Sequence, residues 1–345
     1  MQKPFFSIII PAYNLENYIA ATLQSVLVQT FQDFEIIIVD DGSSDETVSI
    51  IQSFHDPRIR LVSQVNGGVS RARNAGMKKA VGAYIAFLDG DDYWYPEHLE
   101  LAADFFNRHP EILAYANRYM RDELAAIPPR PPSYPESIRR LGIRGVLFMN
   151  SSSVILNSSL ASRLPPWEEA MPYGEDGLYW TRCMRGTGLI GLGGSVTSIY
   201  RQRASSAMHD EHYQHISLHS LIAPLLNELE AMKNPKWQIA VHYLVIRELH
   251  PKRLLSLNAE ERISLTGRIR KIMHPCLNRP FLDSYMKACS ARAGMEQSFS
   301  ALMDRTMFSC KWLDRLERMG RSLFFRLQTN NGMESKHQDP VRSRS

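Results

Sequence analysis

Short apolar runs alternate with helical patterns along the first 117 residues, and this alternation limits the fold more than any other feature of the chain. Each run has the length of a strand and is bounded by turn residues. Helices placed between apolar strands indicate parallel pairing, with both faces of the sheet covered. We therefore expect an α/β fold with a mostly parallel sheet flanked by helices, and with strands at Phe5–Ile10, Phe34–Val39, Ile59–Val62 and Ala83–Leu88.

Four helices are expected between and after these strands. Asn14 is the expected N-cap of the first helix, and Asp45 that of the second. The third begins at Asn66–Gly68 and ends before Gly82, which is a stop signal. The fourth carries Pro96 in its first turn, where the missing N–H costs nothing.

Acidic residues follow two of these strands directly. Because parallel strands end on the same edge of a sheet, both clusters are expected on one rim. Neighbouring carboxylates in a crevice favour a divalent cation that prefers oxygen, such as Mn²⁺ or Mg²⁺. Alternatively, these residues only cap helices and fill turns. The two clusters are Asp40-Asp41 and Asp89-Gly90-Asp91-Asp92. Their expected position on one rim favours a site for metal and phosphate over simple capping.

The pattern changes after the fourth helix. Residues 118–145 are rich in proline and are expected to form a variable insertion. A helix around 174–186 follows, and the periodicity is almost wholly helical after about residue 210. We expect a first domain at 1–205, a helical C-terminal domain at 206–328 and a disordered tail at 329–345.

Composition excludes several classes of protein. The chain has 345 residues, of which 44% are hydrophobic and 22% charged, which is ordinary globular composition. Its net charge of +4 forms no basic stripe, so no nucleic-acid partner is expected. The apolar runs are too short to cross a bilayer, and the N-terminus lacks the pattern of a signal peptide. The four cysteines form no Cys-x-x-Cys pair, which favours a reducing cytoplasm.

Four ordered motifs carry a resemblance to a known family. The chain resembles a family-2 glycosyltransferase over roughly residues 4–205. The resemblance implies a GT-A fold and transfer with inversion from a nucleotide-diphosphate donor, most simply a UDP-sugar. The motifs are Pro11-Ala12-Tyr13-Asn14, Val39 to Asp45, Gly68 to Gly76 with Ala72-Arg73-Asn74, and Phe87 to Asp92.

The resemblance implies roles on the donor side of the site. The Pro11–Asn14 turn and Asp40 are expected to hold the base, and Tyr13 either stacks on it or belongs to the core. Asp91 is the expected metal ligand, with Asp89 in support. Arg73 is expected to face the donor phosphates and ribose. The full set of donor-binding residues is Pro11, Ala12, Tyr13, Asn14, Asp40, Arg73, Asp89 and Arg203.

On the acceptor side, Glu175-Asp176 resembles the family's E-D motif at the start of a helix. Asp176 is the expected catalytic base, which takes a proton from the acceptor hydroxyl; Glu175 and Trp167 are expected to bind the acceptor. Alternatively, the two carboxylates only complement the helix dipole, and Trp167 is buried. Arg203 stands where the family's closing segment usually has a histidine.

Two C-terminal patterns leave alternatives open. A basic amphipathic helix at 312–327 either lies peripherally on the cytoplasmic membrane face or packs on the helical domain. The histidines at 209, 212, 215 and 219 line one helix face and favour a solvated surface over a zinc site.

The resulting hypothesis is an inverting glycosyltransferase that acts on a glycan or lipid-linked saccharide in cell-surface polysaccharide biosynthesis. The rivals are a non-catalytic, nucleotide-binding scaffold subunit and a sugar-phosphate nucleotidyltransferase. The second rival should carry a Gly-rich loop where Pro11–Asn14 stands. Nothing in the sequence determines the oligomeric state.

Overall fold

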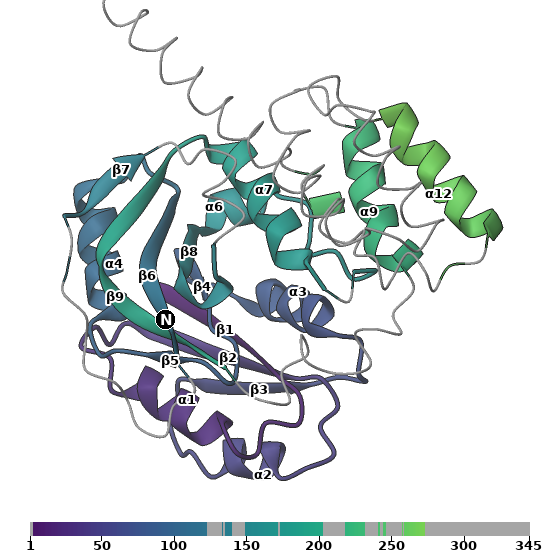
Figure 1. The fold of residues 1–345 in the computed structure, drawn as a ribbon. Coiled ribbons are helices and arrows are strands. Elements are labelled where there is room, and N and C mark those ends of the chain that lie inside the picture. The colour runs from purple at the N-terminus through teal and green to yellow at the C-terminus, as the bar shows by residue number, and fades with distance from the viewer. Residues whose placement is uncertain are drawn as a thin grey trace, which may run out of the picture.

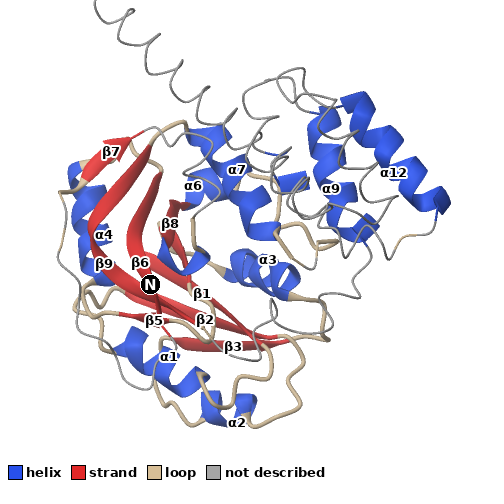
Figure 2. Cartoon of the chain, viewed as in Figure 1, coloured by secondary structure: helices blue, strands red, loops and turns tan. Residues whose placement is uncertain are grey.

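One mixed sheet organises the computed structural model (Figures 1 and 2). The structure describes residues 3–122, 133, 135–139, 149–171, 173–202, 218–231, 241, 244, 245, 257 and 259–272. Within them, nine strands pair in the order β3-β2-β1-β4-β8-β6-β9-β5, and β7 pairs with β9. The strands are β1 Phe6–Ala12, β2 Phe34–Asp40, β3 Ile59–Ser63, β4 Tyr84–Phe87, β5 Tyr93–Trp94, β6 Ala114–Asp122, β7 Ser137–Arg139, β8 Val154–Asn157 and β9 Ile190–Arg201.

The prediction of a parallel N-terminal sheet is confirmed. The four predicted apolar runs coincide with β1 to β4, which all pair in parallel. Beyond β4, the sheet is mixed: β8 is antiparallel to β4 and β6, and β9 returns parallel to β6. The fold class is therefore α/β with a mostly parallel sheet, as expected.

Helices cover both faces of this sheet (Figure 1). On one face lie α1, α2 and α4, and on the other α3, α6 and α7, with α9 packed against α7. A single 3-10 turn, Ser151–Ser153, leads into β8. The helices are α1 Ile19–Leu27, α2 Thr47–Gln52, α3 Val69–Lys79, α4 His98–Arg108, α6 Ser158–Ala161, α7 Glu175–Thr187, α9 Leu218–Ala231 and α12 Ala259–Ile272.

The three consecutive isoleucines of β1 show why this strand reads as a continuous apolar run. Side chains alternate between the two faces of a strand. Ile8 and Ile10 accordingly pack in the cluster beneath α1 and α2, whereas Ile9 packs with α6 and α7 on the opposite face. All three are fully buried, because helices cover both faces.

Two expected helix starts are wrong in detail. Asn14 does not cap α1, which begins four residues after Leu15; it lies in a turn with φ +50°, and its side-chain oxygen accepts a hydrogen bond from the Ser44 N–H. The residue at the N-cap of α2 is Glu46 rather than Asp45. The Asp45 carboxylate still accepts a hydrogen bond from the Thr47 N–H, so it satisfies a donor in the first turn.

Several expectations fall partly or wholly outside the described residues. Strand β6 continues to Asp122, and β7 lies at Ser137–Arg139, so strand structure occurs within the segment expected to be an irregular insertion. The helix expected at 312–327, the tail at 329–345, Arg203 and His209 lie outside the described residues. Among the helices that the structure does describe, none is long and apolar enough to span a membrane.

Candidate functional site

The predicted acidic residues gather at the carboxyl edge of the parallel strands. Asp40 is the last residue of β2 and pairs in register with Ala12 of β1, and Asp89 follows β4 after one residue. Asp40 is 4% exposed, and one of its oxygens accepts a hydrogen bond from the Ser43 N–H at 3.0 Å. The parallel arrangement therefore brings both acidic clusters to one rim, as the sequence predicted.

The Pro11–Asn14 turn opens onto this rim. Pro11 and Ala12 are buried within β1, whereas Tyr13 is 49% exposed and Asn14 is exposed. The backbone N–H of Asn14 donates to the Ser43 hydroxyl at 3.0 Å, which ties the turn to the loop after β2. The exposed Tyr13 ring is available to a flat ligand, so its stacking on a base stays a prediction.

Asp41 organises the start of α3, a role that sequence reasoning missed. Its carboxylate accepts hydrogen bonds from the Gly68 N–H at 2.7 Å, the Gly67 N–H at 3.0 Å and the Gln64 side-chain amide at 2.7 Å. Gly68 has φ +88°, a conformation that favours glycine. The detectable signal was an aspartate followed in the chain by a Gly-Gly helix start, since anions bind at helix N-termini.

Asp92 anchors the turn that carries Asp89 and Asp91. It is fully buried and accepts hydrogen bonds from the Ser152 hydroxyl at 2.5 Å and the Arg201 N–H at 3.0 Å. The Ser152 hydroxyl in turn accepts the Asp89 N–H at 3.0 Å. Burial raises the pKa of Asp92 well above its usual value, and repulsion from Asp91 and Asp89 adds to this rise. The three carboxylates are therefore close enough to repel one another.

Arg73 joins the two predicted motifs of the site. One terminal nitrogen of its guanidinium donates to Asp89 at 2.7 Å, and the other donates to Glu175 at 2.9 Å. Arg73 is 3% exposed; burial opposes its charge, but Asp89 and Glu175 outweigh burial and raise its pKa. Each terminal nitrogen binds one carboxylate, and the contact expected between Arg73 and the donor phosphates and ribose stays a prediction. It positions the site from within.

Glu175 and Asp176 begin α7 and differ in their surroundings. Glu175 is buried and bound to Arg73, whereas Asp176 is partly exposed. Burial raises the pKa of Glu175 to about 7; repulsion from Asp176 adds to this, and Arg73 opposes it. Of the pair, Asp176 is the more exposed, and the acceptor contact expected of Glu175 stays a prediction.

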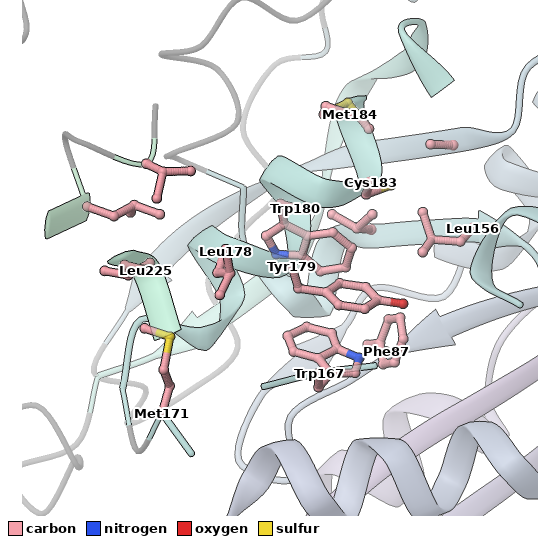
Figure 3. Packing of buried hydrophobic residues seen from close by; sticks show 14 of the residues in the cluster. Phe87, Leu156, Trp167, Met171, Leu178, Tyr179, Trp180, Cys183, Met184 and Leu225 are labelled. Atoms are coloured by element: carbon pink, nitrogen blue, oxygen red, sulfur yellow. The ribbon is translucent and has the colours of Figure 1, made fainter. Parts of the chain in front are cut away.

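Trp167 is part of the core rather than a sugar platform, and this prediction is wrong. Its ring is 1% exposed and stacks on Tyr179 at 4.0 Å between centroids, with Phe87 and Trp180 at its edges (Figure 3). The Arg73 guanidinium lies 4.4 Å from the Trp167 ring centroid. The tryptophan thus holds the arginine in place through a cation–π contact.

The carboxylates at this rim suit a divalent cation with oxygen preference. Asp91 and Asp89 supply only carboxylate oxygens, and no group of three metal-binding side chains occurs in the part of the chain that the structure describes. Mg²⁺ binds through one or two carboxylates together with substrate phosphates. The residues present therefore fit a cation that completes its shell with a diphosphate.

Comparisons with known proteins agree with this geometry. The family model described as "Glycosyl transferase family 2" matches residues 7–158. The chain is 32% identical over 212 residues to the UDP-Glc:alpha-D-GlcNAc-diphosphoundecaprenol beta-1,3-glucosyltransferase WfgD of Escherichia coli, covering 60% of this chain and 80% of WfgD. It is 50% identical over 92 residues to the uncharacterized glycosyltransferase EpsJ of Bacillus subtilis, which covers 26% of this chain and only 27% of EpsJ.

Solved structures show the same fold. S. aureus TarS 1–349, in complex with UDP-GlcNAc, superposes with a TM-score of 0.65 at 20% identity, over 88% of this chain and 91% of that one. The mannosyltransferase PcManGT of Pyrobaculum calidifontis, in complex with GDP-Man and Mn²⁺, has a TM-score of 0.54 at 15% identity, over 89% and 88% of the two chains. The GT-A-like fold is thereby confirmed. The family model matches residues 7–158, and the chain covers 80% of WfgD at 32% identity. The chain therefore belongs to glycosyl transferase family 2.

Proposed function

We propose that this chain is an inverting glycosyltransferase that transfers a sugar from a UDP-sugar to a hydroxyl of a lipid-linked saccharide. The observation that carries the proposal is the Arg73 bridge. One buried guanidinium binds both Asp89 and Glu175. Asp91 follows Asp89 by two residues and Asp176 follows Glu175 directly, so the bridge keeps both of them near the same rim. A donor site and a base must meet in this way for a direct displacement.

The proposed reaction assigns one task to each group. The Asp176 carboxylate takes the proton of the acceptor hydroxyl while the hydroxyl oxygen attacks the anomeric carbon. The bond from this carbon to the donor diphosphate breaks, and its electron pair leaves with the diphosphate. A divalent cation held by Asp91 and Asp89, Mn²⁺ or Mg²⁺, would supply positive charge next to that leaving group. Attack opposite the leaving group inverts the anomeric configuration.

The name of WfgD supports the proposed substrates. That relative is named for UDP-Glc as donor and for a saccharide on diphosphoundecaprenol as acceptor. TarS was solved with UDP-GlcNAc and with UDP. The proposal extends to cell-surface polysaccharide biosynthesis in the cytoplasm, where the basic pattern at 312–327 would hold the enzyme at the inner membrane face.

Donor binding is tested first, by thermal unfolding with UDP, GDP, dTDP or CMP in the presence of Mn²⁺, Mg²⁺ or EDTA. A ligand at about 100 times its dissociation constant adds ~2.7 kcal/mol to the free energy of unfolding. We expect UDP with metal to raise the midpoint and Asp91→Ala to abolish that rise. A rise with another nucleotide would mean that the donor carries that nucleotide instead of UDP. No rise with any nucleotide would contradict the proposal and favour a non-catalytic scaffold subunit.

Catalysis is tested separately with Asp176→Asn. We expect transfer to fall by ~10²-fold or more while the UDP-induced rise in midpoint persists, because general-base catalysis contributes on that scale. Glu111→Gln is the control, since the Glu111 side chain is 63% exposed and contacts no residue of the rim. Unchanged transfer in Asp176→Asn would remove this residue from the role of base.

A further inference from the structure

The helix that carries Asp176 is buried on nearly all sides. Between Glu175 and Met184, Asp176 is the one residue of α7 that is not buried. A helix buried all round is covered by more than one element of the fold. The sheet covers one side of α7, where Phe87 of β4 lies edge-on to Tyr179 (Figure 3). The rest of the cover comes from residues C-terminal to β9, to which the proposed reaction gives no role.

These covering residues lie in α9 and in a second helical part of the chain. Val241, Leu244 and Val245 have helical backbone and are buried, and their spacing of three and four residues places them on one helix face. They belong to the same apolar cluster as Leu178 of α7 and Leu225 of α9. The helix of the proposed base and the C-terminal helical residues therefore share one core.

Leu244 packs directly on the turn that carries Asp176. A Cβ added at Gly177 would lie 2.9 Å from Leu244 Cδ2 and 3.5 Å from its Cδ1. Glycine is unfavourable within a helix, and Gly177 is not among the described glycines with positive φ, so its backbone conformation does not require glycine. The close approach of Leu244 is the physical reason for a glycine at this position.

Gly177 in turn holds the carboxylate of Asp176. The Gly177 N–H donates to Asp176 Oδ1 at 2.6 Å, and the Gly177 carbonyl accepts the Thr181 hydroxyl at 2.7 Å. A displacement of Gly177 would turn the Asp176 carboxylate, because one of its two oxygens is bonded to that residue. The packing of Leu244 thus reaches the proposed base through one hydrogen bond.

Helix α9 binds α7 further along its length. Glu228 of α9 accepts hydrogen bonds from Arg182 Nε at 2.9 Å and from Arg185 at 3.0 Å. Arg182 also donates to the Pro166 carbonyl at 3.2 Å, so this group joins α9, α7 and the segment that precedes α7. Arg182 lies six residues after Asp176, which is ~9 Å along the helix axis. The C-terminal residues therefore fix α7 at two levels, at its middle and at its first turn.

We propose that the C-terminal helical residues position the catalytic base, with Leu244 as the positioning residue. The inference rests on the proposed function, which gives Asp176 the role of base. Leu244 touches no substrate; it holds Gly177, and Gly177 holds the carboxylate. A displacement of about 1 Å at a reacting group can cost on the order of 10²-fold in rate, so this packing is close enough to control turnover. A merely structural contact would affect stability and leave the rate of the folded protein unchanged.

The first test is Leu244→Ala, assayed at a temperature at which every variant is folded. We expect kcat to fall about tenfold or more, while the donor KM and the UDP-induced rise in thermal midpoint stay unchanged. Leu244→Met keeps most of the side-chain volume and should retain most of the wild-type kcat. Leu265→Ala is the matched control, since it truncates a buried leucine of α12, which packs on α9; it should lower the midpoint but not kcat. An unchanged kcat in Leu244→Ala, or an equal fall in Leu265→Ala, would overturn the proposal.

A rescue experiment tests the contact itself. Gly177→Ala places a methyl group against Leu244 and should lower kcat. In Gly177→Ala/Leu244→Ala, this methyl group occupies space that the leucine has left, so kcat should exceed the product of the two single effects. Effects that simply multiply would mean that the two residues do not act through their contact, and would overturn the proposal.

Amide hydrogen exchange separates this inference from the proposed function, because it needs no substrate. Exchange in the first turn of α7 should be faster in Leu244→Ala than in the wild type and in Leu265→Ala. This result would support Leu244 as the residue that holds the turn even if transfer were never detected, whereas Asp176→Asn decides the role of the base by itself. Unchanged exchange in Leu244→Ala would overturn the positioning role and leave the assignment of the base as it stands.

Discussion

The buried carboxylate of Glu175 should make the stability of this protein fall with rising pH. The folded chain raises the pKa of Glu175 to about 7 from an ordinary value of 4.5, chiefly through burial and then through repulsion from Asp176. Between these two values the folded protein keeps a proton on Glu175 that the unfolded chain releases. Stability therefore decreases as pH rises from about 4.5 to about 7.

The size of this effect follows from the two pKa values. Each tenfold change in proton affinity is worth ~1.4 kcal/mol, so the ionised Glu175 costs the folded state about 3 kcal/mol at pH 8. Glutamine cannot ionise, but its carbonyl oxygen can still accept the Arg73 bond now made by Glu175 at 2.9 Å. Glu175→Gln should therefore match the wild type near pH 4 and exceed its stability by up to about 3 kcal/mol at pH 8.

The assay is urea unfolding of the two proteins at intervals between pH 4 and pH 8. The comparison cancels groups common to both, among them His98. Burial lowers the pKa of this histidine to about 3, so its contribution is lost as pH falls below its unfolded value. That slope is opposite in sign to the one from Glu175 but equal in the two proteins. Glu111→Gln, at a side chain that is 63% exposed, is the matched control and should follow the wild type.

Two results would refute this reasoning. Parallel stability curves for the wild type and Glu175→Gln would mean that Arg73 holds Glu175 ionised throughout, and that the bridge outweighs burial. A variant that is less stable than the wild type at pH 8 would mean that the charged bond to Arg73 stabilises the fold. Either result would make the Arg73–Glu175 pair an ordinary stabilising ion pair.

Two further substitutions test the packing beneath the rim. Gly90→Ala should lower the free energy of unfolding by about 1–3 kcal/mol, because the new Cβ would lie 2.6 Å from a methyl group of Leu15. The control Gly267→Ala, in an open part of α12, should leave this free energy unchanged or raise it by up to ~1 kcal/mol, and equal shifts of the thermal midpoint in the two variants would contradict the argument. Ser152→Ala should lower the free energy of unfolding by about 1–3 kcal/mol, because the Asp89 N–H and the buried Asp92 carboxylate both lose the Ser152 hydroxyl. It should also reduce the rise in thermal midpoint that UDP causes with metal, whereas an unchanged midpoint of the free protein would show that water replaces the hydroxyl.

The sequence predicted the strands and the acidic rim, because both depend on patterns within short stretches of the chain. The strands β1 to β4 were predictable because covered parallel strands read as continuous apolar runs, as in the three isoleucines of β1. The meeting of Asp40 and Asp89 on one rim followed from strand direction alone. The order of β8, β6 and β9 did not, because pairing between strands far apart in the chain leaves no periodic signal.

The errors concern side chains whose partners are distant in sequence. Trp167 was expected to bind the acceptor, with burial as the alternative; its partners Tyr179 and Arg73, supplied by α7 and α3, leave it buried. Asn14 has the composition of an N-cap, but Ser44, thirty residues further on, offers its side chain a backbone N–H. Local propensity is a weak prior at such positions, because tertiary contacts override it.

A single arginine explains why these distant motifs form one site. Arg73 is separated by sixteen residues from Asp89 and by 102 from Glu175, yet it bonds both within 3 Å. The planar guanidinium can hold two carboxylates in fixed directions, which a lysine ammonium on a flexible stem cannot do. Trp167 beneath the guanidinium removes its remaining freedom, and Asn74, the next residue of α3, fixes the backbone of Trp167. The spacing between the Asp89 turn and the start of α7 is thus set by buried groups, and the proposed metal ligands and the proposed base depend on it. The partly exposed Asp176 and the exposed Tyr13 lie outside this core, where we propose that they meet the substrates.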